Sequence, residues 1–501
     1  MKKGILIFLV GCFAFSSYAQ SDWDKIIDDK LVSVLFSHKE LVSIPNLPRD
    51  IESMYRNISW VRKRYKKLGF EFQTLESSTL PVLFAEKKVD ENLKTVLFYF
   101  HLDGQPVNPE AWDQEDPFKP ELKAWSPKGE WKSIAWDNLN EKVDDDWRIF
   151  GRAAADDKAP IVMMLSALEI LNAQGDQPKF NMKIIFDLEE EYSSNGFLST
   201  LDKYKEKYEA DYMIIMDGPA HNSNQPTLTF GCRGVAKCSI TTHGAKLPQH
   251  SGHYGNYVSN PVFTLSRLLS AMKSEDGKVL IDGYYDGITI TPEIKEMLNA
   301  VPDNMPTINN GLKINEAEKV GSSYQESLQY PSFNVRQIGT SWKGKGLKTV
   351  IPEYARADID VRLVVETDGQ KQIDKIKRHI EKQGFLVLDR FPTDEERMKY
   401  SKIITFKSSA GVNAFRTEMN SPFGEKLRKN LTNTFGKSPV SIRTMGGTVP
   451  IIPAINTLKI PAIIVPMVNM DNNQHSPNEN IRIGNVRQGI KICLSILSTE
   501  L

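Results

Sequence analysis

A run of acidic residues follows a segment of the sequence that is typical of a buried strand. The segment IIFDLEEEYSSNGF (184–197) begins with apolar, β-favouring side chains and continues with Asp187, Glu189, Glu190 and Glu191. Carboxylates this close together repel one another, and burying them is costly unless a cation lies against them. The run is therefore either a solvated loop or part of a site that holds a metal ion.

Histidine and acidic side chains also follow, or lie beside, other predicted strands and helices. These are His101 and Asp103 after TVLFYF (95–100), Asp156 and Asp157 before a helix that begins near Pro160, Asp217 after YMIIM (212–216), and His475 after PAIIVPMV (461–468). Ligands of open α/β sheets bind beyond the carboxyl ends of the strands, so we expect these side chains at one edge of a sheet.

Each of these motifs taken alone has an ordinary structural explanation. An Asp pair before a helix is usually an N-cap, an Asp-Gly-Pro segment is usually a turn, and an acidic run is usually solvated. Together they supply two imidazoles and several carboxylates without a thiolate, a donor set that suits zinc, manganese or cobalt. The combination therefore favours a site for two divalent metal ions.

The elements that must position these side chains alternate in type along the chain. Apolar strands separated by helices predict a mostly parallel sheet that is covered on both faces. From about residue 233 the pattern changes to antiparallel strands and helices, and after about 412 the first pattern returns. We therefore predict an α/β catalytic domain, split into 20–232 and 412–501, with a smaller α+β domain inserted at 233–411.

Between residues 104 and 148 the chain is acidic and rich in tryptophan, with little periodicity. We interpret this segment as a packed surface excursion near the candidate site. We also hypothesise that it shapes the pocket for the amine side of a substrate amide.

Length and charge limit the possible classes of protein. A chain of 501 residues with 40% apolar residues can build two or three domains. Its 63 basic and 63 acidic residues give a formal net charge of zero, so charge offers no argument for binding nucleic acid or an anionic membrane. The sparse cysteines Cys232, Cys238 and Cys493 do not form a disulfide framework.

The first residues have the features of a secretory signal peptide. MKKGILIFLVGCFAFSSYAQ has two lysines, an apolar run and small residues at Ser17 and Ala19, which predicts cleavage after Ala19. A lipid-attachment site at Cys12 is a minor alternative. No later segment approaches the ~20 apolar residues of a transmembrane helix. We therefore expect a secreted or periplasmic protein with a leader at 1–19.

The ordered set of motifs resembles that of the dinuclear zinc metallopeptidases, a family of carnosinases, bacterial dipeptidases, glutamate carboxypeptidases, desuccinylases and aminoacylases. The matching segments are HLDGQPV (101–107), GRAAADDKAP (151–160), DLEEEYSSNGF (187–197), MDGP (216–219), QHSGHYG (249–255), KTVIP (348–352), DVRLV (360–364), GGTVP (446–450) and QHSPNE (474–479). Their combination spans the mature chain, and the HSG and TVIP segments are most similar to the dipeptidase branch.

The resemblance implies a role for each residue that matches a metal ligand of the family. His101 and Asp217 would hold one metal ion, Glu191 and His475 would hold the other, and Asp156 would bridge the two. It implies two divalent ions per subunit, with zinc expected and manganese or cobalt as alternatives.

Two further acids have implied roles near the metal ions. Asp103 would orient the imidazole of His101, and Glu190 would be the general base that takes a proton from water and passes it to the leaving amine. The family often has glycine where this chain has Ser193, and an acid followed by glycine where it has Asp187-Leu188. These departures concern the shape of the loop.

The resemblance also implies substrate contacts and a partner. His250 matches a histidine that the inserted domain of a partner subunit supplies for the oxyanion, and Arg362 matches an arginine that pairs with a substrate carboxylate. Thr349, Gly446 and Gly447 match positions that contact the substrate. The inserted domain would thus be a lid and the dimerisation domain of a homodimer.

The sequence leads to one principal function and two alternatives. We expect an exported di-metal peptidase that hydrolyses the amide bond of dipeptides or short peptides with a free C-terminal carboxylate. An N-acyl-amino-acid hydrolase with the same metal site is the first alternative. An inactive exported peptide-binding protein on the same scaffold is the second.

Overall fold

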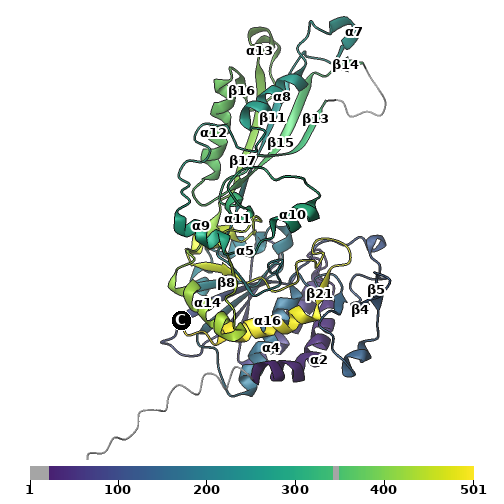
Figure 1. Ribbon diagram of the computed structural model, residues 1–501, viewed down its shortest axis with the longest axis vertical. Helices are drawn as coiled ribbons and strands as arrows, with labels where there is room; N and C mark the ends of the chain where they lie inside the picture. Colours follow the sequence, from purple (N-terminus) through teal and green to yellow (C-terminus); the bar gives the residue numbers. More distant parts are fainter. Residues whose placement is uncertain (1–21, 342–348) are drawn as a thin grey trace, which may run out of the picture. The chain divides into compact units, whose positions relative to one another are not determined.

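The computed structural model describes residues 22–341 and 349–501 (Figure 1). The predicted leader (1–19) and Cys12 lie outside the described residues. The described chain forms two compact units. Unit 1 comprises the residues up to Leu228 together with Asn420–Val440 and Ile460–Leu501, and unit 2 comprises Thr229–Met419 and Ser441–Lys459.

Unit 1 is built around a mixed eight-stranded sheet with the strand order β1-β2-β7-β3-β8-β20-β9-β19. The strands are β1 (Glu71–Leu75), β2 (Val82–Lys87), β3 (Thr95–His101), β7 (Asn181–Asp187), β8 (Tyr212–Ile215), β9 (Thr227–Thr229), β19 (Val440–Ile442) and β20 (Ala462–Ile464). β7, β3, β8 and β20 are parallel to one another, whereas β2 pairs in antiparallel fashion with both β1 and β7. The predicted α/β class is confirmed, and its parallel strands form the centre of the sheet.

Three helices of unit 1 pack against one another although they are distant in sequence (Figure 1). They are α2 (Asp22–Val42), α4 (Lys158–Ala173) and α16 (Ile483–Leu497). α4 is almost entirely buried, as expected for a helix that is apolar on all sides. Pro160 lies in its first turn, where a missing N–H breaks no helical hydrogen bond. The remaining α-helices of this unit are α3 (Ile51–Tyr65), α5 (Asn195–Thr200), α6 (Lys205–Tyr208) and α14 (Pro422–Phe435).

The 104–148 segment contains regular structure that its weak periodicity did not predict. β4 (Glu121–Trp125), β5 (Trp131–Ser133), β6 (Arg148–Phe150) and β21 (Asn480–Arg482) form an antiparallel sheet in the order β21-β6-β4-β5. These strands have only three to five residues. One partner comes from the far end of the chain, so local periodicity could not reveal the pairing.

Unit 2 contains a five-stranded sheet in the order β13-β15-β11-β17-β16. The strands are β11 (Gly234–His243), β13 (Asn334–Thr340), β15 (Tyr354–Leu363), β16 (Leu386–Leu388) and β17 (Ile403–Val412). The pairings within this sheet are antiparallel except that of β16 with β17. Helices α8 (Pro261–Met272) and α12 (Gly369–Lys382) pack on this sheet.

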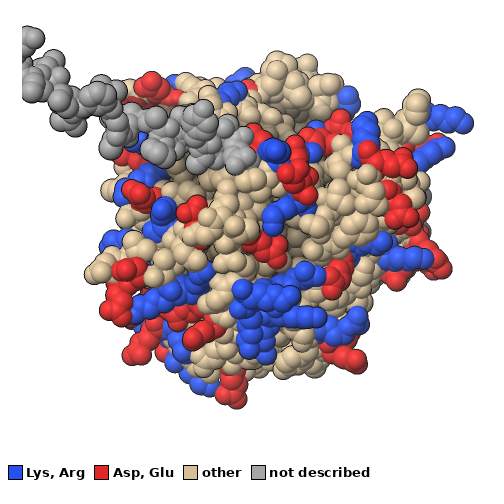
Figure 2. All heavy atoms as spheres, turned by 90° about the horizontal axis from the view of Figure 1, so that it is seen from below, with Lys and Arg blue, Asp and Glu red and all other residues tan. Residues whose placement is uncertain are grey.

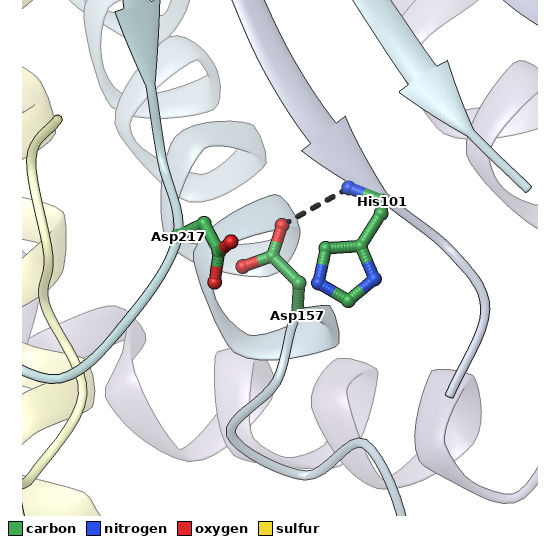
Figure 3. Close-up of side chains that lie close together, drawn as sticks. All are labelled: His101, Asp157 and Asp217. Atoms are coloured by element: carbon green, nitrogen blue, oxygen red, sulfur yellow. Dashed lines mark hydrogen bonds between the residues drawn. The ribbon is translucent and has the colours of Figure 1, made fainter. Parts of the chain in front are cut away.

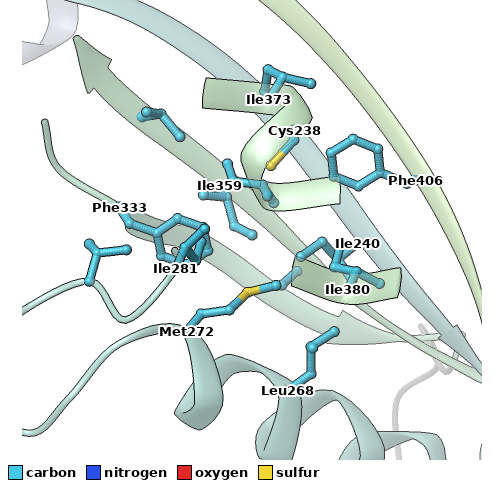
Figure 4. Packing of buried hydrophobic residues seen from close by; sticks show 14 of the residues in the cluster. Cys238, Ile240, Leu268, Met272, Ile281, Phe333, Ile359, Ile373, Ile380 and Phe406 are labelled. Carbon is cyan, nitrogen blue, oxygen red and sulfur yellow. The ribbon is translucent and has the colours of Figure 1, made fainter. Parts of the chain in front are cut away.

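The core of unit 2 lies between the sheet and these two helices. Figure 4 shows Leu268 and Met272 of α8 and Ile380 of α12 beside the sheet residues Ile240 and Ile359. The smaller elements of this unit are α7 (Ser251–Tyr254), α9 (Pro292–Asn299), α10 (Met305–Leu312), α11 (Tyr324–Ser327), α13 (Asp394–Lys399), α15 (Ile452–Leu458), β10 (Gly231–Cys232), β12 (Gln249–His250), β14 (Val350–Ile351) and β18 (Phe415–Arg416).

One segment falls in a different unit from the one that the sequence predicted. The sequence analysis assigned all of 412–501 to the catalytic domain, but residues 441–459 belong to unit 2. The physical reason is backbone pairing: the Met445 N–H donates to the Gly231 carbonyl at 2.9 Å, and the Arg233 N–H donates to the Met445 carbonyl at 3.2 Å.

Charged side chains of both signs are interspersed over the face of the molecule that Figure 2 shows. This mixture agrees with the equal numbers of basic and acidic residues in the sequence. Within residues 22–341 and 349–501, no helix combines the length and the apolar character needed to cross a bilayer.

Candidate metal centre

The sheet of unit 1 brings the predicted ligand residues to one edge. His101 ends β3 and is the register partner of Asp187 at the end of β7, and Asp217 follows β8. Glu190 and Glu191 begin the short 3₁₀ turn η4 (Glu190–Tyr192) after β7. Parallel strands end at the same edge, which is why residues distant in sequence meet here.

Two groups of side chains at this edge have ligand atoms within 4.8 Å of one another. One consists of His101, Asp157 and Asp217 (Figure 3). The other consists of Asp156, Glu191 and His475. All five residues predicted as metal ligands therefore lie in these groups, together with Asp157, to which the sequence analysis gave no role.

Asp156 lies between the two histidines. Its Oδ1 is 2.9 Å from Nε2 of His101, and its Oδ2 is 3.0 Å from Nε2 of His475. Burial alone would raise the pKa of Asp156, but the hydrogen bonds with both imidazoles outweigh it and leave the pKa below its ordinary value. The carboxylate thus presents one oxygen to each side, as the predicted bridging ligand must.

The other acids in the groups are buried. Burial raises the pKa of Asp217 to about 6 and that of Glu191 to about 7. Nε2 of His475 lies 3.2 Å from Oε2 of Glu191. Without a cation, these carboxyls keep their protons to a higher pH than they would in water, because they share one desolvated site. A divalent cation would favour the ionised forms.

Asp157 is the residue of this centre that sequence reasoning missed. Its Oδ2 accepts a hydrogen bond from the backbone N–H of His101 at 3.2 Å (Figure 3), and its buried Oδ1 has no hydrogen-bond partner among the described residues. A buried carboxylate oxygen without a donor is costly. An orphaned oxygen beside imidazole nitrogen and further carboxylates is what a metal site requires, so these residues fit divalent metal ions.

Asp103 connects the two halves of the centre. Its Oδ1 lies 3.4 Å from Nδ1 of His101. Its carboxylate also accepts the backbone N–H groups of Glu190 at 3.0 Å and Glu191 at 3.1 Å. Burial lowers the pKa of His101, but the hydrogen bonds with Asp103 and Asp156 outweigh burial and raise it. One buried carboxylate therefore orients an imidazole and the η4 turn together.

Glu190 sits among the charged groups of the centre. Burial raises its pKa well above the ordinary glutamate value; His101 counteracts this, whereas Asp217 and Asp156 add to it. A carboxyl whose pKa is raised above its ordinary value suits transfer of a proton between water and an amine.

Glu479 supports the centre from the segment that carries His475. Its fully buried carboxylate accepts the backbone N–H groups of Ala153, Ala155 and Asp156 at 2.9–3.0 Å. It also forms a buried ion pair with Arg152 at 2.7 Å. The sequence showed Glu479 only as the last residue of QHSPNE, and no local signal linked it to a loop more than 300 positions earlier.

The remaining acids of the run stabilise the loop. Asp187 accepts a hydrogen bond from the Tyr99 hydroxyl at 2.8 Å, and Glu189 accepts the backbone N–H groups of Leu80 and Gly196 at 3.2 Å. The opening run of four acids therefore divides between structural and site roles. Gln105, at the start of the 104–148 segment, donates to Glu191 at 2.7 Å.

Residues predicted to contact the substrate form two groups in unit 2. His250 accepts the Gly252 N–H at its Nδ1 at 3.0 Å, and its Nε2 lies 3.4 Å from the Thr349 hydroxyl. Arg362 donates to the Thr448 hydroxyl at 2.9 Å, directly after Gly446 and Gly447. The structure thus brings Arg362 to the GGTVP segment and His250 to Thr349.

Comparison with known proteins agrees with this arrangement. The model of peptidase family M20/M25/M40 matches residues 97–499. The Cys-Gly metallodipeptidase dug1 of Schizosaccharomyces pombe is 25% identical over 487 residues, which cover 93% of this chain and 95% of that protein. The Beta-Ala-His dipeptidase of Mus musculus is 24% identical over 470 residues, which cover 90% and 88%. The M20 family metallo-carboxypeptidase Sso-CP2 from Sulfolobus solfataricus has a TM-score of 0.71 at 25% identity, covering 93% of this chain and 98% of that one.

Proposed function

Because the chain belongs to peptidase family M20/M25/M40 and is a metal-dependent hydrolase, we propose that it hydrolyses the amide bond of dipeptides or short peptides with a free C-terminal carboxylate. The observation that carries the proposal is the position of Asp156, with one oxygen toward His101 and the other toward His475. The dipeptidase relatives give the substrate class, and their coverage extends over nearly the whole chain.

Two divalent metal ions are proposed for this centre, and zinc is the metal that we expect. His101 and Asp217 would hold one, Glu191 and His475 would hold the other, and Asp156 would hold both, with Asp157 beside the first. Such ions supply Lewis acidity that polarises a carbonyl and makes water more acidic.

Glu190 is the proposed general base. The residue takes a proton from the attacking water at a carboxylate oxygen and delivers it to the nitrogen of the departing amine. Asp103 holds the Glu190 backbone N–H, which fixes the turn from which the side chain projects. The typical contribution of such proton transfer is ~10²–10⁴-fold in rate.

His250 and Arg362 are the proposed substrate contacts from unit 2. Because the Gly252 N–H donates to Nδ1 of His250, a neutral His250 carries its proton on Nε2 and is a hydrogen-bond donor there. This is the form needed to stabilise an oxyanion. Arg362 would pair with the substrate carboxylate, with Thr349, Gly446 and Gly447 as further contacts.

A homodimer through unit 2 and export through the 1–19 leader complete the proposal. β13 is the terminal strand of its sheet, and Val335 and Ile338 on it are exposed. An unpaired strand edge with exposed apolar side chains favours association with a second copy.

Export through the 1–19 leader predicts a mature chain that begins at Gln20. N-terminal sequencing of the protein recovered from the periplasm or the medium tests this prediction.

The function is tested by metal content and hydrolysis in the same samples. We expect wild-type protein to bind about two metal ions per chain and to cleave dipeptides, and Glu190→Ala to keep the metal and lose at least ~10²-fold in kcat. Cleavage of N-acyl amino acids but not of dipeptides would identify the deacylase instead. Wild-type protein that takes up no metal and cleaves neither substrate would contradict the proposal.

A further inference from the structure

A cavity of about 620 Å³ lies in unit 1 and is built from parts distant in sequence. Its walls come from the β4–β5 hairpin, the segment that leads into β6, and the loop between β20 and β21. No residue of the two candidate ligand groups is among its described lining residues. Its volume falls in the ~300–1,000 Å³ range of small-molecule sites.

One wall of the cavity is aromatic. Trp125 and Trp131 are cross-strand partners whose ring centroids are 5.0 Å apart at an angle of 68°. Phe150 lies 5.4 Å from Trp131. The Trp125 side chain is 57% exposed, although an indole is among the most favourable side chains to bury. The hairpin therefore presents an exposed indole ring at the cavity.

The opposite walls are polar, and two of their three carboxylates, Asp146 and Asp471, already form ion pairs with arginines. Arg148 donates to Asp471 at 2.7 Å, and Asp113 accepts a hydrogen bond from the Asn478 amide at 3.1 Å. Asp146 accepts from Arg482, outside this cavity, at 2.6 Å. The cavity therefore offers hydrogen-bond donors and acceptors without a strong net field.

These two properties exclude the simpler classes of ligand. An organic cation would need unpaired carboxylates beside the aromatic wall, but Arg148, which lies 4.8 Å from the Trp131 ring, neutralises Asp471, and Arg482 neutralises Asp146. A purely apolar ligand would take the amides and carboxylates of the other walls out of water without replacing their hydrogen bonds.

A sugar ring has groups that can bind to both the aromatic wall and the polar walls. Its axial C–H groups form an apolar face that packs on the electron-rich face of an indole. Its hydroxyls point outward around the ring and both donate and accept hydrogen bonds. Asparagine amides and paired carboxylates are suitable partners, because each offers fixed donors or acceptors in a plane.

We propose that this cavity binds a neutral carbohydrate, with a pyranose ring stacked on Trp125 and its hydroxyls bonded to the Asp and Asn side chains of the facing walls. The loop from Asp471 to Asn480 supplies four of the lining residues and also carries His475. The carbohydrate site and the candidate metal centre therefore share one loop but no described ligand residue.

The test measures binding by saturation-transfer NMR, with no reference to hydrolysis. The probes are cellobiose, maltose and the N-acetylglucosamine disaccharide at millimolar concentration, with benzyltrimethylammonium as the cationic probe. We expect at least one disaccharide to receive magnetisation from the protein, and Trp125→Ala to weaken its binding by about tenfold or more. Tyr55→Ala, which removes a 49% exposed aromatic ring from α3, is the matched control and should change nothing.

Trp131→Leu is the second variant, and circular dichroism establishes that each variant is folded. Loss of binding in folded Trp125→Ala or folded Trp131→Leu, with retention in Tyr55→Ala, supports the site. Absence of transfer to all three disaccharides, transfer that is undiminished in both tryptophan variants, or selective binding of benzyltrimethylammonium overturns the proposal. Because the probes are not peptides, these outcomes are independent of the proposed peptidase activity.

Discussion

Individual residues of the centre were predictable where their chemistry was visible in the sequence. His101, Asp156, Asp217 and His475 follow or flank apolar segments, and several acids and imidazoles in such positions together indicate a site, although none does so alone. Asp157 was not predicted as a ligand because an Asp pair before a helix is usually an N-cap. The structure shows that Asp157 forms no side-chain capping hydrogen bond.

The buried acids of the centre predict an unusual pH dependence for metal-free protein. Burial raises the pKa of Glu191 from 4.5 to about 7. Between these pH values the folded protein retains a proton that the unfolded chain has released. The contribution of Glu191 to the free energy of unfolding therefore falls as pH rises. A Glu191→Gln substitution keeps the neutral form at every pH, and we expect its stability relative to wild type to increase by about 1–3 kcal/mol from pH 5 to pH 8.

The comparison is made by thermal or chemical denaturation with chelator present. Comparing the variant with wild type is necessary because the buried His38 and His243, whose pKa values burial lowers to about 4, contribute the opposite slope in both proteins. Added zinc should stabilise wild type more at pH 8 than at pH 5, since the ligands release protons on binding. A stability difference that shrinks with pH would contradict the assignment.

Ser193 occupies a backbone conformation that favours glycine. Its φ of 78° is in the left-handed region, at the end of the η4 turn that carries Glu190 and Glu191. We expect Ser193→Gly to raise the free energy of unfolding by up to ~1 kcal/mol and Ser193→Val to lower it by more than ~1 kcal/mol. Denaturant titration measures both. Equal stability of the two variants would show that the backbone is not strained at this position.

At the scale of elements, the strands that carry ligands were predictable and the elements that support them were not. β3 has an apolar run at 96–100 and β7 has one at 184–186, which is typical of central parallel strands. The β4–β5–β6–β21 sheet has strands of only three to five residues, and β21 lies more than 300 residues beyond β6. Such pairings depend on tertiary contacts that no local pattern records.

Glu479 connects two elements, so its substitution tests how the loops hold Asp156. Glu479→Gln replaces one of the two accepting oxygens with an NH2 donor, so it loses two of the four hydrogen bonds to this side chain and leaves the buried Arg152 without a counter-charge. We expect metal affinity to fall ~10–100-fold while the secondary structure is kept. Isothermal titration with zinc measures the change. Asp282→Asn, which alters an exposed ion pair with Lys382, is the matched control and should bind as wild type does.

At the scale of the whole molecule, the division into units was partly predictable. The change of pattern near residue 233 indicated an inserted α+β region. The sequence did not predict that residues 441–459 belong to unit 2. This segment joins unit 2 through backbone hydrogen bonds near Gly231 and Met445, and no change in its sequence pattern marks it.

The proposed homodimer has a specific test at β13. Ile338 is 56% exposed on this edge strand, and a lysine there would place charge in the interface. We expect Ile338→Lys to convert the dimer to monomer at micromolar concentration in sedimentation velocity, and to reduce activity through loss of the partner's His250. Ile51→Lys on α3 changes an equally exposed isoleucine, 56%, in unit 1. If Ile51→Lys dissociates the dimer as much as Ile338→Lys does, the interface does not lie at β13.

The bonds of Glu479 also set the order in which this protein can be completed during its synthesis. The loop that presents Asp156 is held by a carboxylate close to the C-terminal end of the chain, and His475 comes from the same late segment. A ribosome releases these residues more than 300 positions after Asp156. The proposed metal centre would therefore be incomplete until the segment that carries His475 and Glu479 has left the ribosome, and metal binding would follow that step.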